Sequence, residues 1–257
     1  MIFRFASAMC LILLVSCSSM KNEIEKNMIK KMNTLTESEI NEGWQLLFDG
    51  KTFNNWRGIG IDSIPSGHWK IENGCIRKIK SGDVPLRADG QPLKGGDLIT
   101  KKMYNDFEFT FDWKICESGN SGIKYNVDEQ YSITNGSSNA LGFEYQILDD
   151  EKNDDNLTLS HRAGSLYDLI EAKDKTLNPV GEFNSSKIIF NKNHGEHWLN
   201  GKKVVEFDIT SQEFIELFKN SKYSKHDDFI KHKIAHIVLQ DHGSDCWYKN
   251  IKIKELK

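Results

Sequence analysis

Apolar and polar residues alternate without interruption from residue 106 to residue 114. Phe107, Phe109, Phe111 and Trp113 occupy every second position, and a charged or hydroxyl residue stands between each pair. Successive side chains of a β-strand point to opposite faces, so this pattern predicts a strand whose aromatic row packs into a core.

The segment 142–150 alternates in chemical kind. Glu144 and Gln146 fall on one face, opposite an apolar row of Phe143, Tyr145 and Ile147. An acid and an amide two residues apart, backed by an apolar face, can present polar groups to a ligand. A half-buried strand with one solvated face is the alternative. A polar loop follows through residue 156, and we expect the segment 165–170 to accompany the strand.

Turn and cap signals divide the remaining chain into short strands. Asn73-Gly74 and Asn200-Gly201 predict type I′ hairpin turns, 118–122 predicts a turn before a strand over 123–127, and 82–96 predicts a long loop. The sequence 36–39 (TESE) is a capping box for a short helix, and 210–213 (TSQE) begins a second helix that reaches about residue 219. Many short strands with few helices predict an all-β sandwich.

The first residues have the features of an export signal. Arg4 precedes an apolar stretch over 8–15 that is too short to span a bilayer, and 14–17 (LVSC) resembles the lipobox of bacterial lipoproteins. We therefore expect a lipoprotein signal peptide at 1–16, lipidation of Cys17, a flexible tether at 17–34 and one domain at 35–257. The expected location is bacterial, membrane-anchored through lipid only, and periplasmic or on the cell surface. An ordinary secretory signal or a plain anchor helix is the alternative.

Charge and cysteine content narrow the functional classes. The net charge of the 257-residue chain is −3, and loss of Arg4 with the leader makes it more negative, so a nucleic-acid partner is not expected. Cys75, Cys116 and Cys246 lie beyond the leader, without the paired spacing of a zinc site or a disulfide framework. Buried free thiols are expected, with one disulfide as the alternative.

Six motifs in order resemble the 3-keto-disaccharide hydrolase family, a domain formerly of unknown function. They are 43–51 (GWQLLFDGK), 119–123 (GNSGI), 144–149 (EYQILD), 164–168 (GSLYD), 197–201 (HWLNG) and 239–243 (LQDHG). The resemblance implies an all-β, concanavalin A-like jelly-roll β-sandwich with one or two short helices. It also implies action on glycosides whose C3 hydroxyl has been oxidised to a ketone. Ala235 departs from the Gly of the family pattern, and 219–233 is unusually rich in Lys and His.

The chemistry of a 3-keto-glycoside sets what a site must supply. The ketone acidifies the proton at C2, so a base can remove it, the C1 substituent can leave by elimination, and water can then add. This route needs a base near C2, an electrophile or metal for the enolate oxygen, and an acid for the leaving group. A conventional glycosidase needs two carboxylates instead. Glu144 with Gln146 pairs an acid with an amide, which favours elimination.

Motif membership and strand faces suggest roles for ten residues. The catalytic candidates are Glu144 as base, Lys124 at the enolate, and His161 and Tyr167 for leaving-group protonation. The candidates for substrate binding are Gln146, Asp168, His197, Asn200, Gln240 and His242, with Asp168 and Asn200 also suited to turns. A divalent metal held by Glu144, His161 and His242 is a further option; otherwise no cofactor is expected.

The expected partners are a 3-keto-glycoside or other oligosaccharide and an upstream sugar 3-dehydrogenase. Three other classes remain open. A non-catalytic carbohydrate-binding module would use exposed Trp such as Trp56 or Trp198, since the same fold hosts lectins. A conventional glycosidase would act on unoxidised glycans, and a structural surface lipoprotein would neither bind nor cleave them.

Overall fold

The computed structural model of the protein describes residues 32–86, 88, 95–135, 140–226, 230–231 and 234–257. The expected signal peptide, Cys17 and nearly all of the expected tether lie outside these residues. In the part of the chain that is described, no helix is long and apolar enough to cross a membrane.

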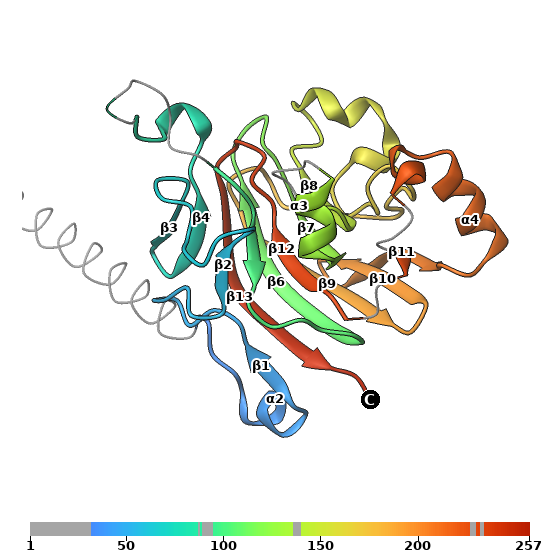
Figure 1. Ribbon diagram of the computed structural model, residues 1–257, viewed down its shortest axis with the longest axis horizontal. Coiled ribbons are helices and arrows are strands. Elements are labelled where there is room, and N and C mark those ends of the chain that lie inside the picture. The colour runs from blue at the N-terminus through green and yellow to red at the C-terminus, as the bar shows by residue number, and fades with distance from the viewer. Residues whose placement is uncertain (1–31, 87, 89–94, 136–139, 227–229, 232–233) are drawn as a thin grey trace, which may run out of the picture.

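Two antiparallel sheets lie face to face (Figure 1). The eight-stranded sheet has the order β11-β10-β9-β6-β13-β4-β3, with β1 also paired to β13, and the five-stranded sheet has the order β2-β5-β12-β7-β8. The larger sheet consists of β1 (Trp44–Leu46), β3 (Trp69–Glu72), β4 (Cys75–Lys78), β6 (Phe107–Ile115), β9 (Asn184–Asn191), β10 (His194–Leu199), β11 (Lys202–Asp208) and β13 (Cys246–Glu255). The smaller sheet consists of β2 (Trp56–Gly58), β5 (Leu98–Thr100), β7 (Asn120–Val127), β8 (Phe143–Leu148) and β12 (His236–Leu239). This is the jelly-roll sandwich that the sequence predicts.

The described helices are all short. The α-helices are α2 (Glu37–Asn41), α3 (Glu129–Thr134) and α4 (Gln212–Lys219), and the 3₁₀ helices are η1 (Ser81–Asp83), η2 (Asp154–Leu157), η3 (Leu159–His161) and η4 (Lys222–Lys225). Thr36 and Glu39 form the predicted capping box, and Ser211 caps α4. Helix α3 was not predicted; Asp128 caps it by accepting a hydrogen bond from the backbone of Tyr131.

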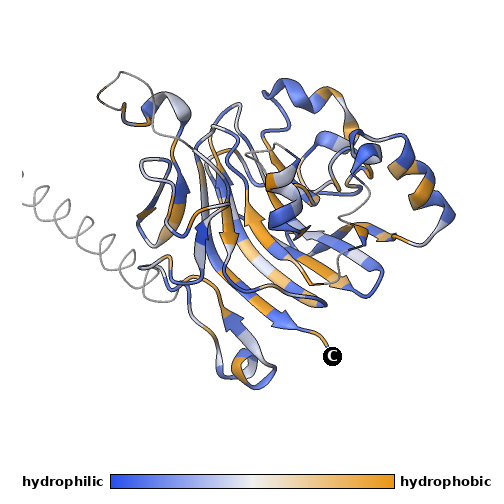
Figure 2. Cartoon of the chain, in the orientation of Figure 1, coloured by the Kyte–Doolittle hydropathy of each residue, from blue (hydrophilic) through white to orange (hydrophobic). Residues whose placement is uncertain are grey.

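The core lies between the two sheets and is rich in aromatic residues. The predicted aromatic row of β6 is buried, and its Phe111 meets Tyr145 of β8 edge to face with the ring centroids 5.5 Å apart. The Trp113 indole donates to Ser186 Oγ at 2.8 Å, and the Tyr145 hydroxyl lies 2.8 Å from the same oxygen. Hydrophobic and hydrophilic residues alternate along the long strands (Figure 2). This packing fixes which face of β8 points away from the core.

Both predicted hairpin turns are present. Asn73 and Gly74 have φ values of 50° and 71°, and Asn200 and Gly201 have 46° and 81°, as type I′ turns require. Asn126 has φ 55° within β7, where the pairing with β12 shifts register between His236 and Val238, and Val127 packs in a small separate cluster with Ile99, Ala140 and Val238. Strand β7 also begins earlier than expected, at Asn120.

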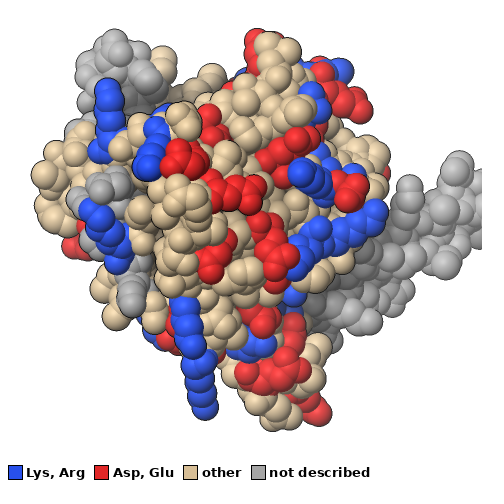
Figure 3. Space-filling model, turned by 90° about the vertical axis from the view of Figure 1, so that its right-hand side faces the viewer, with Lys and Arg blue, Asp and Glu red and all other residues tan. Residues whose placement is uncertain are grey.

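The surface carries both signs of charge. On the face that forms the right-hand side of Figure 1, Asp and Glu side chains gather near the centre, with Lys and Arg around and among them (Figure 3). Charged runs in which Lys alternates with Asp and Glu are expected to produce such a mixed, solvated surface.

Candidate active site

Pairing across three neighbouring strands brings five residues onto one face. Lys124 of β7 is the cross-strand partner of Glu144 of β8, and Gly122 is the partner of Gln146. The backbone N–H of Gln240, just after β12, donates to the Gly122 carbonyl at 3.0 Å. Directly opposed residues share a face of a sheet, so these side chains lie together on the side away from the core. We call these five residues the polar face.

The polar face holds one carboxylate and one ammonium group, both largely removed from water. Glu144 is 4% exposed and Lys124 is 7% exposed, and the Lys124 Nζ lies 4.0 Å from Glu144 Oε2. The same Nζ donates to the Ala140 carbonyl at 2.8 Å. Because a protein interior screens charge less than water does, the ammonium strongly affects any charge that forms beside it.

Two amide carbonyls of the polar face lack a hydrogen-bond partner among the described residues. Gln146 Oε1 and Gln240 Oε1 are both buried and unpaired, although Gln146 Nε2 makes a long 3.4 Å contact with Asn120 Oδ1. Leaving a buried acceptor unpaired costs about 1–3 kcal/mol, so such groups are rare unless a ligand satisfies them. Hydroxyl groups of a sugar are donors of the required kind.

Gly122 makes room for this arrangement. A Cβ at Gly122 would lie 2.7 Å from Glu144 Oε1 and 3.2 Å from Gln240 Oε1. Both distances are shorter than ordinary van der Waals contact. The absence of a side chain at Gly122 therefore allows the carboxylate and the amide to approach each other across β7.

A second polar cluster borders Glu144. The Tyr167 backbone N–H donates to the Glu144 carbonyl at 2.9 Å, and the Tyr167 ring stacks on His161 with the centroids 4.1 Å apart. His161 Nδ1 lies 2.7 Å from Asp155 and Nε2 lies 3.0 Å from Asp168, so carboxylates occupy both ring nitrogens. The Tyr167 hydroxyl donates to Asp155 at 3.1 Å. Burial and the neighbouring carboxylates raise the pKa of Tyr167.

These contacts change the predicted roles of three residues. His161 and Tyr167 were predicted to protonate the leaving group, but the Tyr167 hydroxyl donates to Asp155 and the two ring nitrogens of His161 face Asp155 and Asp168. Asp168 has φ 60° and accepts a hydrogen bond from the Lys222 backbone at 2.7 Å, which matches its alternative role as a turn and hydrogen-bond anchor.

Three residues that were predicted to bind substrate are not part of the polar face. His197 is fully buried between the sheets, with Nε2 2.9 Å from the Tyr125 hydroxyl and Nδ1 3.0 Å from the Gly164 carbonyl, and burial lowers its pKa to about 4. Asn200 holds its hairpin by bonding Thr176, Ser185 and Asn184. His242 is exposed because β12 ends at Leu239, so the strand alternation does not extend to it.

The predicted metal ligands do not form a set. Within the described ranges, one group of three His, Cys, Asp or Glu ligand atoms lies close enough to hold an ion, and it consists of His194, Glu196 and Glu206. These residues are on the β10–β11 hairpin, where Lys203 forms ion pairs with both glutamates. Glu144, His161 and His242 are not among them, so we derive no step through a metal.

Sequence reasoning missed two carboxylates behind the polar face, Asp97 and the partly buried Asp241. Asp97 is fully buried and accepts the backbone N–H groups of Ala140 at 2.8 Å and Asp241 at 2.7 Å. Asp241 in turn pairs with Lys78 at 2.9 Å and with His68 at 3.3 Å. Burial raises the pKa of Asp97, and the charge of Lys124 opposes that rise. The LQDHG motif contains Asp241, but no local pattern marks Asp97.

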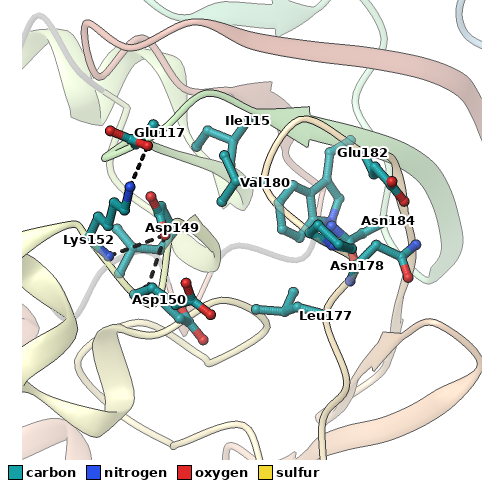
Figure 4. A pocket seen from close by; sticks show the side chains of 14 residues that line it. Ile115, Glu117, Asp149, Asp150, Lys152, Leu177, Asn178, Val180, Glu182 and Asn184 are labelled. Atoms are coloured by element: carbon teal, nitrogen blue, oxygen red, sulfur yellow. Dashed lines mark hydrogen bonds and ion pairs between the residues drawn. The ribbon is translucent and has the colours of Figure 1, made fainter.

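The two acids that follow β8 line a cavity apart from the polar face. Asp149 and Asp150 border a cavity of about 340 Å³ with Leu177 and Val180 on its apolar side (Figure 4). The Asp149 carboxylate accepts three backbone N–H groups, and Asp150 pairs with Lys175. No residue of the polar face lines this cavity.

The tryptophans do not support the binding-module alternative. Trp56 is 1% exposed and its indole donates to the Leu47 carbonyl at 2.9 Å, so it cannot stack on a sugar at the surface. Trp198 is half-buried on the outer side of β10, beneath the ammonium of Lys187.

Comparison with known proteins agrees with this fold and identifies the family. Residues 43–254 match the model of the 3-keto-alpha-glucoside-1,2-lyase-like domain. A curated Bacteroides thetaiotaomicron protein, "3-keto-disaccharide hydrolase", is 32% identical, and the alignment covers 95% of this chain and 94% of that protein. A Parabacteroides distasonis crystal structure, provisionally described as a glycosyl hydrolase, is 32% identical with a TM-score of 0.75 over 88% of this chain and all of that one. Another from the same organism is 26% identical with a TM-score of 0.56, over 79% of this chain and all of that one. The chain therefore belongs to the 3-keto-alpha-glucoside-1,2-lyase-like family.

Proposed function

We propose that this protein cleaves glycosides whose C3 hydroxyl has been oxidised to a ketone. Glu144 removes the proton at C2, and the resulting enolate expels the C1 substituent. Water then adds at C1, so that the net reaction is hydrolysis. The observation that carries the proposal is a single buried carboxylate on the polar face, with an ammonium 4.0 Å away.

Each residue of the polar face has a task in this route. The Lys124 ammonium stabilises the negative charge that develops on the C3 oxygen. The unpaired carbonyls of Gln146 and Gln240 accept hydrogen bonds from sugar hydroxyls and hold the C2–H bond toward Glu144. His161 and Tyr167 support the edge of β8 and do not donate the proton.

The hydrogen bonds that the neighbouring carboxylates already make favour elimination over conventional glycoside hydrolysis. A conventional enzyme needs a second available carboxyl group roughly 5–9.5 Å from the first. The other acids around this face are engaged, since Asp97 accepts two backbone N–H groups and Asp155 and Asp168 hold His161. Glu144 is thus left as the base.

The test is turnover of a 3-keto-disaccharide beside its unoxidised parent, in deuterated water, with and without chelator. We expect monosaccharide release from the keto substrate alone, with deuterium at C2. Cleavage of the parent disaccharide would establish a conventional glycosidase instead. Loss of turnover with chelator would show that a metal takes part in the reaction, although the described residues of this site do not form a set of metal ligands.

Glu144→Gln tests the base directly. The amide keeps the shape of the side chain but cannot take a proton, so we expect kcat to fall by about 10²–10⁴-fold with an unchanged unfolding temperature. The variant should also lose exchange of the C2 proton with solvent. Undiminished turnover would show that another group is the base.

The proposed reaction requires a supply of oxidised sugar and a place of action. A sugar 3-dehydrogenase upstream would provide the ketone, and a lipid on Cys17 would hold the enzyme at a bacterial membrane surface, in the periplasm or outside the cell. Metabolic labelling with a tritiated fatty acid, comparing the natural chain with Cys17→Ala, tests the anchor. Equal labelling of both chains would contradict it.

A further inference from the structure

Lys222 places a second ammonium group beside the polar face. It is the first residue of η4, and its backbone N–H is fixed by Asp168 Oδ2 at 2.7 Å. Its Nζ lies 3.7 Å from the ring centroid of Tyr167 and 4.9 Å from that of Tyr223. Tyr167 is bonded through its backbone to the Glu144 carbonyl, so the ammonium stands over the ring that adjoins Glu144.

The two lysines near Glu144 occupy different environments. Lys124 is buried on the strand, whereas the Lys222 side chain is exposed and comes from the Lys- and His-rich segment that departs from the family pattern. Partial desolvation lowers the pKa of Lys222, while the charges of Glu144, Asp168 and Asp155 oppose this shift and that of Lys124 adds to it. One cation is therefore buried on the polar face, and the other is exposed to solvent over the Tyr167 ring.

The position of a bound substrate follows from this difference. The keto sugar must reach the buried Glu144 and Lys124, so the remainder of a disaccharide extends toward solvent. Lys222 is an exposed cation that lies over the ring of Tyr167, the residue whose backbone bonds Glu144, so we place it on the side where the rest of the disaccharide extends. Tyr167, which adjoins it, donates its hydroxyl proton to Asp155, and both ring nitrogens of His161 face carboxylates.

We infer that Lys222 is a further catalytic residue, the acid that protonates the leaving group. This inference rests on the proposed function. As the C1–O bond breaks, its electron pair goes to the glycosidic oxygen, which takes a proton from Lys222 Nζ. The electron pair of the enolate forms the C1=C2 double bond and restores the C3 ketone. In hydration, water adds at C1, Lys222 takes a proton from that water, and Glu144 returns its proton to C2.

Leaving-group dependence tests the inference. An alkoxide needs protonation to depart and a nitrophenolate does not, so Lys222→Met should lower kcat for a 3-keto-disaccharide by about 10²-fold and for a nitrophenyl 3-keto-glucoside by less than about 3-fold. Lys222→Arg keeps the charge, but a guanidinium is too weak an acid, so it should bind the disaccharide with an unchanged KM and turn over as slowly as Lys222→Met. Lys225→Met, an exposed lysine of the same 3₁₀ helix, is the matched control and should match the natural enzyme on both substrates.

The outcomes separate the inference from the proposed function. Equal losses on the two substrates, no loss on either, or full recovery in Lys222→Arg would each overturn the acid role while leaving the elimination route standing. An unmodified enzyme that cleaves neither keto substrate would overturn the proposed function and the inference together.

Discussion

Gly122→Ala should slow turnover strongly while leaving the enzyme folded. The new Cβ would lie 2.7 Å from Glu144 Oε1, and ordinary contact begins near 3.4 Å, so the carboxylate must move by about 0.7 Å or the strands must separate. Gln240 Oε1, at 3.2 Å, must yield as well. A displacement approaching 1 Å at a reacting group costs up to about 10²-fold in rate, so we expect kcat to fall by roughly 30–100-fold.

The stability of Gly122→Ala should change far less than its activity. Overpacking costs about 1–3 kcal/mol, and the reduced entropy of the unfolded chain returns about 0.4–1 kcal/mol. We therefore expect a net loss of about 0–2.6 kcal/mol by urea unfolding, measured beside kcat on a 3-keto-disaccharide. Gly82→Ala is the matched control, because no atom lies within 4 Å of its added Cβ. Natural kcat in Gly122→Ala would refute the placement of Glu144 as the base, since the reacting group would then not lie beside Gly122.

Three further predictions concern residues buried in or behind the polar face. Gln146→Leu removes an unpaired acceptor, so the unfolding free energy should stay constant or rise by about 1 kcal/mol while KM rises at least about 10-fold; an unchanged KM would contradict its role in binding. Lys124→Met should lower kcat by about 10²–10³-fold without affecting C2 deuterium placement in residual product, and natural kcat would remove it from the mechanism. Burial lowers the pKa of His197 from 6.5 to about 4, so the unfolded chain binds a proton that the folded chain refuses. The contribution of His197 to the unfolding free energy is complete above about pH 6.5 and falls by about 3 kcal/mol as the pH drops to about 4. Urea unfolding of His197→Gln across this range should lack that part of the pH dependence. An equal change of unfolding free energy with pH in both proteins would contradict the assignment.

The sandwich was predictable because its signals are local. Strict alternation over 106–114 requires a two-sided strand, and Asn-Gly pairs at 73–74 and 200–201 adopt the positive φ values that hairpins need. Alternation with antiparallel pairing also gave most of the polar face, since Glu144, Lys124 and Gln146 lie on polar rows of motif strands. Helix α3 escaped prediction because its six residues carry no amphipathic period that distinguishes them from a loop.

The errors arise where a strand reverses the usual relation between polarity and burial. In β10, Gly195, His197 and Leu199 face the core while Trp198 faces outward, so hydrophobicity does not reveal the inner face. His197 is tolerated inside because the Tyr125 hydroxyl and the Gly164 carbonyl pair with both of its nitrogens. Neither partner is near it in sequence, so only the fold shows that this motif histidine is structural.

The position of Lys222 depends on contacts that sequence patterns do not encode. Lys222 belongs to a run of lysines that looks like a solvated surface, and its position follows from α4, from η4 and from the Asp168 carboxylate that fixes its backbone. The same carboxylate holds His161, which stacks on the ring that Lys222 covers. Asp168 thus links the placement of the outer cation to the edge of β8, where Glu144 lies. The proposed elimination needs a positive charge beside the enolate and a proton for the glycosidic oxygen. The buried Lys124 can stay fixed beside the enolate, and solvent can restore the proton of the exposed Lys222.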